Sequence, residues 1–544
     1  MKKLLTKLAI LGLATATVFS FAACSNADFN GGASNSTNDG SGGNQNWTGP
    51  TAPEAPDKGD RPNSGNADSA EGGAGSGSLG SEGGAGGDIY DDGYGGNYVY
   101  NDIVEQDFVD VAETPASYFS LDRNTASYSQ VRSQLGYGWK ISPASVRVEE
   151  LINYFDYDFE APTESAVGVS AYLSDCPWND SHKLMLAGVK TTEINLEDVN
   201  GNYVFLIDVS GSMSADNRIG LAKRSLKKLV DGLGDNDVVS IVTYASGISK
   251  VLDGGECTKD GKDKIKEKID GLKASGATYA SGGLELAYET AQKHFITGGN
   301  NRVIIISDGD FNVGISNTDT MMEYISGKAE SGVYLSVFGV GMGNMRDDML
   351  ETLARNGNGN YAYLDNDMEA EKAFGHDLGG TLITVAKDAK AGVTFEDTVV
   401  KYRLIGYDTK LISEDQYYDD TTDTGEIGSN LCVAALYEIE LAENAEGAIA
   451  NVEVRYKDVT GEGEKVNTVS VEVTTYTPSS DDLSFAACVA EFGLVLRQSK
   501  YAENANLYAV LERLSGLTQY ISADPYRAEF VNLVGKASEI YNKK

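Results

Sequence analysis

Basic residues are scarce in this chain. Its 544 residues include 44 lysines and arginines against 81 aspartates and glutamates, which gives a formal net charge of −37. Binding to nucleic acid or to anionic lipid through a surface patch requires clustered lysine and arginine, so this balance argues against both. The same charge favours solubility, cation binding and repulsion between copies. It names no partner, because a generically acidic extracellular protein has the same composition.

Cysteine and histidine are scarce as well. The five cysteines and three histidines are widely scattered, and no two cysteines form a Cys-x-x-Cys pair. A zinc ribbon, a thioredoxin-type motif and a Ser-His-Asp triad therefore have little support. Export would permit disulfides, but we expect most of the cysteines after Cys24 to be buried thiols. These are Cys176, Cys257, Cys432 and Cys488.

Residues 1–23 carry the features of a lipoprotein signal peptide. Three lysines within the first seven residues precede Leu8 to Ala23, an uncharged apolar stretch too short for a comfortable membrane span. The stretch ends Phe-Ala-Ala-Cys at Cys24, which resembles a bacterial lipobox. That resemblance implies cleavage before Cys24, diacylglycerol on its thiol and a stable membrane anchor on the extracytoplasmic face. An ordinary secretory signal with a chance cysteine is the alternative.

Residues 24–97 predict a disordered stalk. They consist largely of Gly, Ser, Asn, Asp and Glu, and Lys58 and Arg61 are the basic residues among them. Such a segment buries too little apolar surface to offset the entropy of ordering its backbone. About 70 residues of flexible chain span on the order of 45 Å, so we expect the stalk to carry a folded head away from the membrane.

The rest of the chain predicts three further regions. Residues 98–199 show short helical and then extended patterns. Residues 379–544 show strands, including one extended segment at 393–404, followed by helices. Between them, residues 200–378 alternate apolar strands, such as those at 238–244, 333–340 and 361–364, with amphipathic helices. This alternation is typical of a mostly parallel sheet covered on both faces. We predict a doubly wound, Rossmann-like α/β domain inserted in a β-rich, sandwich-like domain with flanking helices.

Three polar loops fall where an open α/β sheet binds ligands, at the carboxyl ends of its strands. Asp208-Val209-Ser210-Gly211-Ser212 follows the first apolar strand, Gly276-Ala277-Thr278 lies in a loop of small residues, and Ser307-Asp308-Gly309-Asp310 follows the strand at 303–306. A lone Asp-x-Ser-Gly-Ser could be a helix cap. All three loops in chain order make a shared site the better interpretation.

This Asp-x-Ser-x-Ser, Thr, Asp pattern resembles the metal ion-dependent adhesion site of von Willebrand factor A (VWA) domains. The resemblance implies that Ser210, Ser212 and Thr278 offer hydroxyl oxygens to a metal, and that Asp208 and Asp308 act directly or through water. Hard oxygen donors suit Mg²⁺ best here, with Mn²⁺ or Ca²⁺ as alternatives, and do not suit Zn²⁺ or copper. An open coordination position on the ion could accept an acidic residue from a protein partner.

Competing motifs fit less well. The segment from Gly255 to Lys262 departs from the spacing of a phosphate-binding P-loop. The acidic runs at 365–367 and 419–425 have no glycine in the register that an EF-hand loop requires, and the second is better interpreted as a solvated turn.

Further segments resemble bacterial YfbK-like VWA lipoproteins over about residues 115–540. They include Phe119 to Tyr128, Val148 to Phe155, Ser307 to Gly314, Tyr402 to Tyr407 and Phe485 to Gly493. The resemblance implies a cell-surface lipoprotein and does not imply a particular ligand, because these proteins are largely defined by their domains.

Three functions are compatible with these features. The first is a surface module, not an enzyme, that binds a protein partner through the metal. The second is a metal-dependent hydrolase, which lacks a visible His or Glu general base, although Asp310 is close in sequence. The third is a solute-binding lipoprotein, for which a second matching lobe and a hinge are missing.

Overall fold

The computed structural model describes residues 88–91, 97–100, 104–121, 123–278, 281–309, 318–341, 347–459 and 465–542. The predicted signal peptide, Cys24 and the predicted stalk up to residue 87 lie outside these ranges. Near the end of the predicted stalk, where we expected no regular structure, β1 (Asp88–Asp91) and β2 (Asn97–Tyr100) form an antiparallel pair. None of the helices within the described ranges has the length and apolar character that a bilayer span requires.

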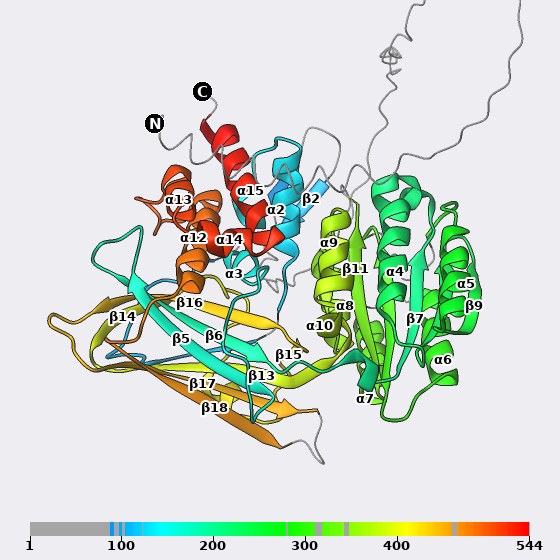
Figure 1. Ribbon diagram of the computed structural model, residues 1–544, viewed down its shortest axis with the longest axis horizontal. Coiled ribbons are helices and arrows are strands. Elements are labelled where there is room, and N and C mark those ends of the chain that lie inside the picture. The colour runs from blue at the N-terminus through cyan, green and yellow to red at the C-terminus, as the bar shows by residue number, and fades with distance from the viewer. Residues whose placement is uncertain are drawn as a thin grey trace, which may run out of the picture. The chain divides into compact units, whose positions relative to one another are not determined.

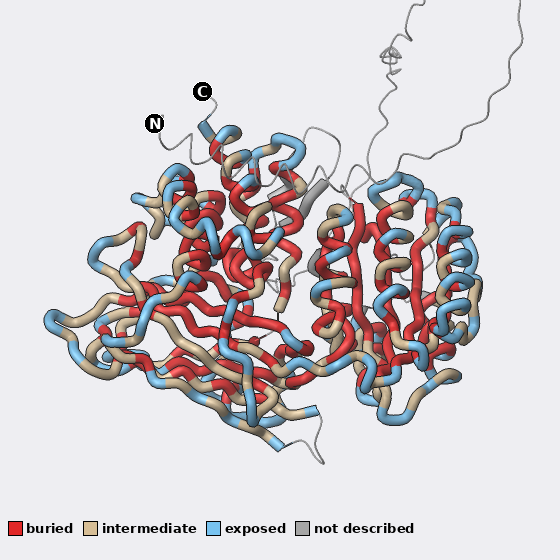
Figure 2. The backbone as a smooth tube through the Cα atoms, in the orientation of Figure 1, coloured by how far each residue is buried: buried red, intermediate tan, exposed pale blue. Residues whose placement is uncertain are grey.

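A six-stranded sheet forms the centre of the α/β domain (Figure 1). Its order is β12-β11-β10-β7-β8-β9, and neighbours run parallel except β8 and β9. The chain proceeds outward from β7 in both directions, so the topological switch point lies between β7 and β10. Every residue of these two strands is buried (Figure 2). The strands are β7 (Gly201–Asp208), β8 (Val238–Tyr244), β9 (Ile248–Glu256), β10 (Asn300–Ser307), β11 (Val333–Val340) and β12 (Tyr361–Leu364).

Helices cover both faces of this sheet. One face packs against α4 (Leu221–Gly232), α5 (Lys259–Asp270), α9 (Asp367–Glu371) and α10 (Leu378–Leu382). The other packs against α6 (Ser281–Lys293), α7 (Thr318–Glu330) and α8 (Asp347–Asn356). Two apolar cores result, one on each side of the sheet, as the alternation of strands and helices predicts.

Two antiparallel sheets form the β-rich domain. One has the order β15-β13-β17-β18, with β4 also paired to β13, and the other has the order β3-β14-β16-β6-β5. Strands from both sides of the α/β domain in the sequence share each sheet, so that domain is inserted between β6 and β13, and the predicted fold class is confirmed. The strands are β3 (Val109–Asp110), β4 (Ala116–Ser120), β5 (Val167–Asp175), β6 (Lys183–Thr191), β13 (Thr384–Phe395), β14 (Val399–Leu404), β15 (Gly425–Gly428), β16 (Cys432–Leu441), β17 (Ala448–Asp458) and β18 (Val466–Thr474).

A layer of helices covers the outer face of the sheet that contains β6 and β16. Leu184, Leu186 and Leu436 of that sheet share one buried cluster with residues of the helices. The same sheet's opposite face packs against the other sheet of the sandwich. The helices of the layer are α2 (Ala126–Gly136), α3 (Val148–Ile152), α12 (Asp481–Arg497), α13 (Leu507–Leu514), α14 (Thr518–Ser522) and α15 (Pro525–Asn542), and the short α11 (Glu414–Tyr418) lies beside β4 and β13.

The structure differs from the sequence-based expectations at a few elements. The extended segment 393–404 is two strands, because the chain turns between β13 and β14 and enters the other sheet. Strand β9 and helix α5 were not predicted. The four cysteines after Cys24 are buried free thiols, as expected. Their sulfur atoms therefore contribute to packing and form no disulfide.

Candidate metal site

The predicted site residues cluster at the carboxyl ends of β7 and β10. These strands are parallel neighbours, with Ile306 opposite Ile207. Asp208 is the last residue of β7, and Asp308 directly follows β10. The topological switch point therefore places both buried carboxylates at one edge of the sheet.

The loop after β7 holds its polar groups close together. The Ser210 amide donates a hydrogen bond to Oδ1 of Asp208 at 2.8 Å. The Ser210 and Ser212 hydroxyls lie 2.9 Å apart, within a turn that leads into the short 3₁₀ helix η3 (Gly211–Ser214). Asp208 and Ser210 are buried, whereas Ser212 is exposed. The loop thus opens to the surface on the side of Ser212.

The loop after β10 contacts the first loop through side chains. The Ser307 hydroxyl donates to Oδ2 of Asp208 at 3.2 Å. Oδ2 of Asp308 accepts a hydrogen bond from Nη1 of Arg218 at 2.8 Å, whereas its Oδ1 is buried and accepts none from the described residues. A buried carboxylate oxygen without a donor is costly, so this atom is suited to contact a cation.

The third loop is held against the first by backbone hydrogen bonds. The Gly211 amide donates to the Gly276 carbonyl at 2.8 Å, and the Ser275 amide donates to the Val209 carbonyl at 2.7 Å. Gly276 has a φ of +88°, and a Cβ there would lie 2.4 Å from the Ser246 hydroxyl, so glycine is required. Thr278, which is half-buried, follows this contact by two residues.

Burial dominates the electrostatics of the site. It raises the pKa of Asp208 to about 6, although the Ser210 hydrogen bonds act in the opposite direction. The nearby Asp308 carboxylate raises it further. Burial also raises the pKa of Tyr244 well above its ordinary value. Two carboxylates at a buried sheet edge therefore favour a bound cation.

The residues present fit a hard divalent cation. Carboxylate and hydroxyl oxygens are the donors that Mg²⁺, Mn²⁺ and Ca²⁺ prefer, and Oδ1 of Asp308 lies buried without a donor. Asp208, Ser210, Ser212 and Asp308 would hold such an ion, and Thr278 would join them from the neighbouring loop. Asp310, the nearby residue considered as a possible base, lies outside the described residues.

Two residues of the site have roles that were not predicted: Ser307, which was named only as part of its loop, and Arg218. Ser307 is the last residue of β10, and its hydroxyl holds Asp208. Arg218 lies six residues beyond Ser212, and its guanidinium reaches both the Ser212 carbonyl and Asp308. The serine could have been found from its place at the strand end. Nothing in the spacing of Arg218 indicates its role.

A second acidic cluster lies where the α/β domain joins the rest of the chain. Carboxylate oxygens of Asp156 and Asp377 lie near Nδ1 of His376, close enough to suggest a metal site. Arg123, however, lies 3.4 Å from Asp156 and 3.2 Å from Asp377, and Nζ of Lys372 lies 3.1 and 3.0 Å from the same two carboxylates. Two fixed cations already neutralise the two acids, so we interpret the cluster as structural.

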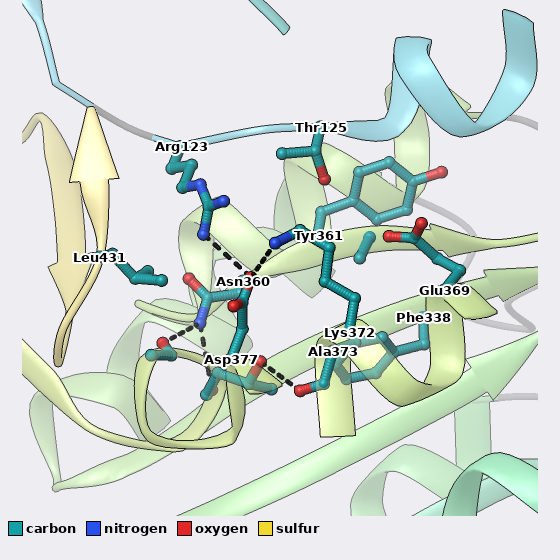
Figure 3. A pocket seen from close by; sticks show the side chains of 13 residues that line it. Arg123, Thr125, Phe338, Asn360, Tyr361, Glu369, Lys372, Ala373, Asp377 and Leu431 are labelled. Carbon is teal, nitrogen blue, oxygen red and sulfur yellow. Dashed lines mark hydrogen bonds and ion pairs between the residues drawn. The ribbon is translucent and has the colours of Figure 1, made fainter. Parts of the chain in front are cut away.

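Figure 3 shows part of this cluster beside a cavity of about 60 Å³. Arg123, Lys372 and Asp377 point toward one another at its wall. The Asn360 amide group donates to the carbonyls of Gly380 and Thr381 at 3.1 and 3.0 Å. The cavity has room for a few water molecules and not for a larger ligand.

Comparison with known proteins assigns the family. The von Willebrand factor type A domain model matches residues 203–310, a von Willebrand factor model matches residues 95–186, and the model of the C-terminal region of the uncharacterized protein YfbK matches residues 380–452 and 440–540. The uncharacterized protein YfbK of Escherichia coli (strain K12) is 35% identical over 463 residues, which cover 79% of each chain. The chain belongs to the YfbK family. The family predicted from the sequence motifs is thereby confirmed.

Other similarities of this YfbK-family protein are weaker. The human voltage-dependent calcium channel subunit alpha-2/delta-2 is 30% identical over 152 residues, 27% of this chain and 13% of that protein. A solved structure, the von Willebrand factor type A protein from Catenulispora acidiphila, is 14% identical, covers 68% of this chain and 96% of its own, and has a TM-score of 0.38. At these values the comparisons add no functional detail.

Proposed function

We propose that the chain is a bacterial cell-surface lipoprotein whose VWA domain binds a protein partner through one divalent cation. The cation, most suitably Mg²⁺, is held by Asp208, Ser210, Ser212, Thr278 and Asp308. The partner offers an acidic side chain to the ion, and Cys24 carries the lipid anchor.

The main support for the proposal is the environment of the Asp308 carboxylate. One of its oxygens is buried without a hydrogen-bond donor, next to the buried Asp208 carboxylate and the paired hydroxyls of Ser210 and Ser212. Such a group is unfavourable by itself, and a hard cation would remove the cost. Mg²⁺ held partly by neutral hydroxyls keeps enough positive charge to attract another carboxylate.

The position of the site supports binding at a surface. Ser212 is exposed while the two aspartates are buried, so an ion between them is reachable from solvent on one side. A protein with a net charge of −37 repels acidic partners in general. A bound cation provides local positive charge on this acidic surface, and that charge can attract an acidic partner.

Partner capture tests the proposal. Full-length wild-type protein is immobilised and exposed to envelope extract with Mg²⁺ or with EDTA, alongside Thr278→Ala and Thr468→Ala. Thr468 is exposed on β18 in the sandwich and serves as the matched control. We expect a defined partner that is retained with Mg²⁺ by wild type and the control, and lost in EDTA and in Thr278→Ala. Equal retention of an identified partner in all four conditions would show that the metal site is not used.

Binding is favoured over hydrolysis by the residue types at the site. Among the described residues that contact Asp208 and Asp308, the side chains are Ser, Tyr and Arg, with neither a histidine nor a glutamate. Histidine is the side chain that most often serves as a general base, and glutamate is another common one. Turnover of a phosphoester or amide substrate that requires Mn²⁺ and disappears in Asp308→Ala would favour the hydrolase instead.

The anchor is tested separately. We expect wild type to incorporate labelled fatty acid and to sediment with membranes, and Cys24→Ala to do neither. A Cys24→Ala protein that still carries the label would place lipidation elsewhere.

A further inference from the structure

Arg218 bridges two of the loops that form the proposed metal site. It belongs to η4 (Asp216–Gly220), a single π-helical turn between the first site loop and α4. Its Nη1 donates to the Ser212 carbonyl at 2.8 Å and to Oδ2 of Asp308 at 2.8 Å. One guanidinium nitrogen therefore connects the loop after β7 to the loop after β10.

A glycine at the end of β11, outside the three site loops, leaves the space for this arginine. Gly341 follows β11 directly and has a φ of +80°. A Cβ at this position would lie 2.4 Å from Cγ of Arg218. The side-chain stem thus lies directly against the backbone at the end of β11, and the lack of a side chain at Gly341 leaves room for the arginine to reach Asp308.

The two oxygens of Asp308 have different surroundings. Oδ2 is paired with Arg218, whose side chain is 21% exposed, whereas Oδ1 is buried without a hydrogen-bond donor. The carboxylate can therefore contact a cation through Oδ1 while Arg218 remains on Oδ2. The site then contains two carboxylates and one fixed positive charge a few ångströms from the ion.

We propose that Arg218 is an internal counter-ion that shares the Asp308 carboxylate with the divalent cation and weakens cation binding. The fixed charge repels the ion and reduces the negative charge that the two aspartates provide. Weak binding has a functional consequence, because occupancy, and with it partner binding, then follows the divalent cation concentration outside the cell. This inference rests on the proposed metal site and adds its regulation.

The test is a titration of the full-length protein with Mn²⁺ alone. The dissociation constant is measured by calorimetry and, independently, by electron paramagnetic resonance of the unbound Mn²⁺. Arg218→Gln keeps a hydrogen-bond donor and removes the charge, whereas Arg218→Lys keeps the charge and loses the planar group. The matched control is Arg224→Gln, because Arg224 lies on the adjoining helix α4 and pairs with the exposed carboxylates of Asp216 and Asp367.

We expect Arg218→Gln to bind Mn²⁺ about tenfold more tightly, the size expected for a unit charge acting on a divalent ion across several ångströms of water-like dielectric. Arg218→Lys and Arg224→Gln should stay within about twofold of wild type. Unchanged or weaker binding in a folded Arg218→Gln protein would overturn the inference and leave the metal site intact. Absence of Mn²⁺ binding by wild type would instead overturn the proposed function.

A second variant gives the same test without altering the arginine. Gly341→Ala places a methyl group against the Arg218 stem and should displace the guanidinium from Asp308. We expect tighter Mn²⁺ binding in this variant also. Binding equal to wild type, in a protein whose circular dichroism spectrum is unchanged, would count against the counter-ion role.

Discussion

Two of the groups of neighbouring carboxylates among the described residues differ in the number of fixed positive charges that face them. At the edge of the VWA sheet, Asp208 and Asp308 face one guanidinium, that of Arg218. At the junction with the rest of the chain, Asp156 and Asp377 face both Arg123 and Lys372.

This difference in facing cations distinguishes a candidate metal site from a structural ion cluster. In both groups the acidic side chains approach closely, and the junction cluster even includes a histidine. The junction carboxylates are fully matched by built-in cations, whereas the sheet edge keeps an excess negative charge and a buried oxygen without a donor. The number of local cations, more than the proximity of the acids, indicates where an external ion is needed.

The largest effect is expected from breaking the junction cluster. Arg123 is 7% exposed and also donates to the Asn153 carbonyl at 2.8 Å. Arg123→Ala leaves the partly buried carboxylates of Asp156 and Asp377 with Lys372 as their remaining fixed cation. It should lower the free energy of unfolding by about 3–5 kcal/mol, measured by denaturant titration. The exposed Arg224→Ala control should lose less than about 1 kcal/mol. Equal losses in the two variants would show that burial does not distinguish these arginines.

Matched Asp→Asn changes compare the two regions directly. Asp377→Asn leaves Arg123 and Lys372 buried with one carboxylate fewer, and we expect a loss of about 3 kcal/mol in unfolding free energy. Asp308→Asn, measured in EDTA, should change stability by less than about 1 kcal/mol, because it removes repulsion from Asp208 as well as the pair with the partly exposed Arg218. A larger loss of unfolding free energy in Asp308→Asn than in Asp377→Asn would reverse our assignment of the two clusters.

Added metal should act on one region alone. An ion that binds the folded state raises stability by about 2.7 kcal/mol when its concentration is a hundred times its dissociation constant. We therefore expect Mn²⁺ to raise the melting temperature of wild type and of His376→Gln, and EDTA to reverse the rise. The rise should be absent in Asp208→Ala. Protection that persists in Asp208→Ala would place the ion elsewhere.

The smallest effect concerns pH at the junction. Nδ1 of the exposed His376 donates a hydrogen bond to Oδ1 of Asp377 at 2.7 Å, and this bond raises the pKa of the histidine. The charged imidazolium is then favoured in the folded state. Its contribution to the stability of the fold is fully present below the ordinary pKa of histidine and is lost as the pH rises through the raised pKa of His376. Wild type should exceed His376→Gln in denaturant midpoint at pH 5.5 and match it at pH 8.5. A constant difference between the two pH values would contradict this.

Much of the fold could be predicted because its signals are local. The strands at 238–244, 333–340 and 361–364 match β8, β11 and β12 in both bounds, since short apolar runs between turns are typical of buried parallel strands. Strand β9 was missed because it is an edge strand that contains two glycines and no fully buried residue. Helix α5 was missed because its buried side chains are limited to Ile265 and Ile269.

The candidate site was predictable where it depends on strand ends and not where it depends on distant contacts. Asp208 and Asp308 follow apolar strands, and the topology of a parallel sheet brings such positions together. Arg218 reaches Asp308 across 90 residues of sequence, and Arg123 reaches Asp377 across 254. No periodicity or spacing encodes contacts of this kind, because they depend on the three-dimensional packing of loops.

The most direct test of the account is Mn²⁺ titration of the full-length wild-type protein, Asp208→Ala and Asp377→Asn, compared by calorimetry. We predict one bound ion per chain in wild type and in Asp377→Asn, and none in Asp208→Ala. Binding that survives in Asp208→Ala and disappears in Asp377→Asn would move the metal to the junction cluster and contradict the central claim.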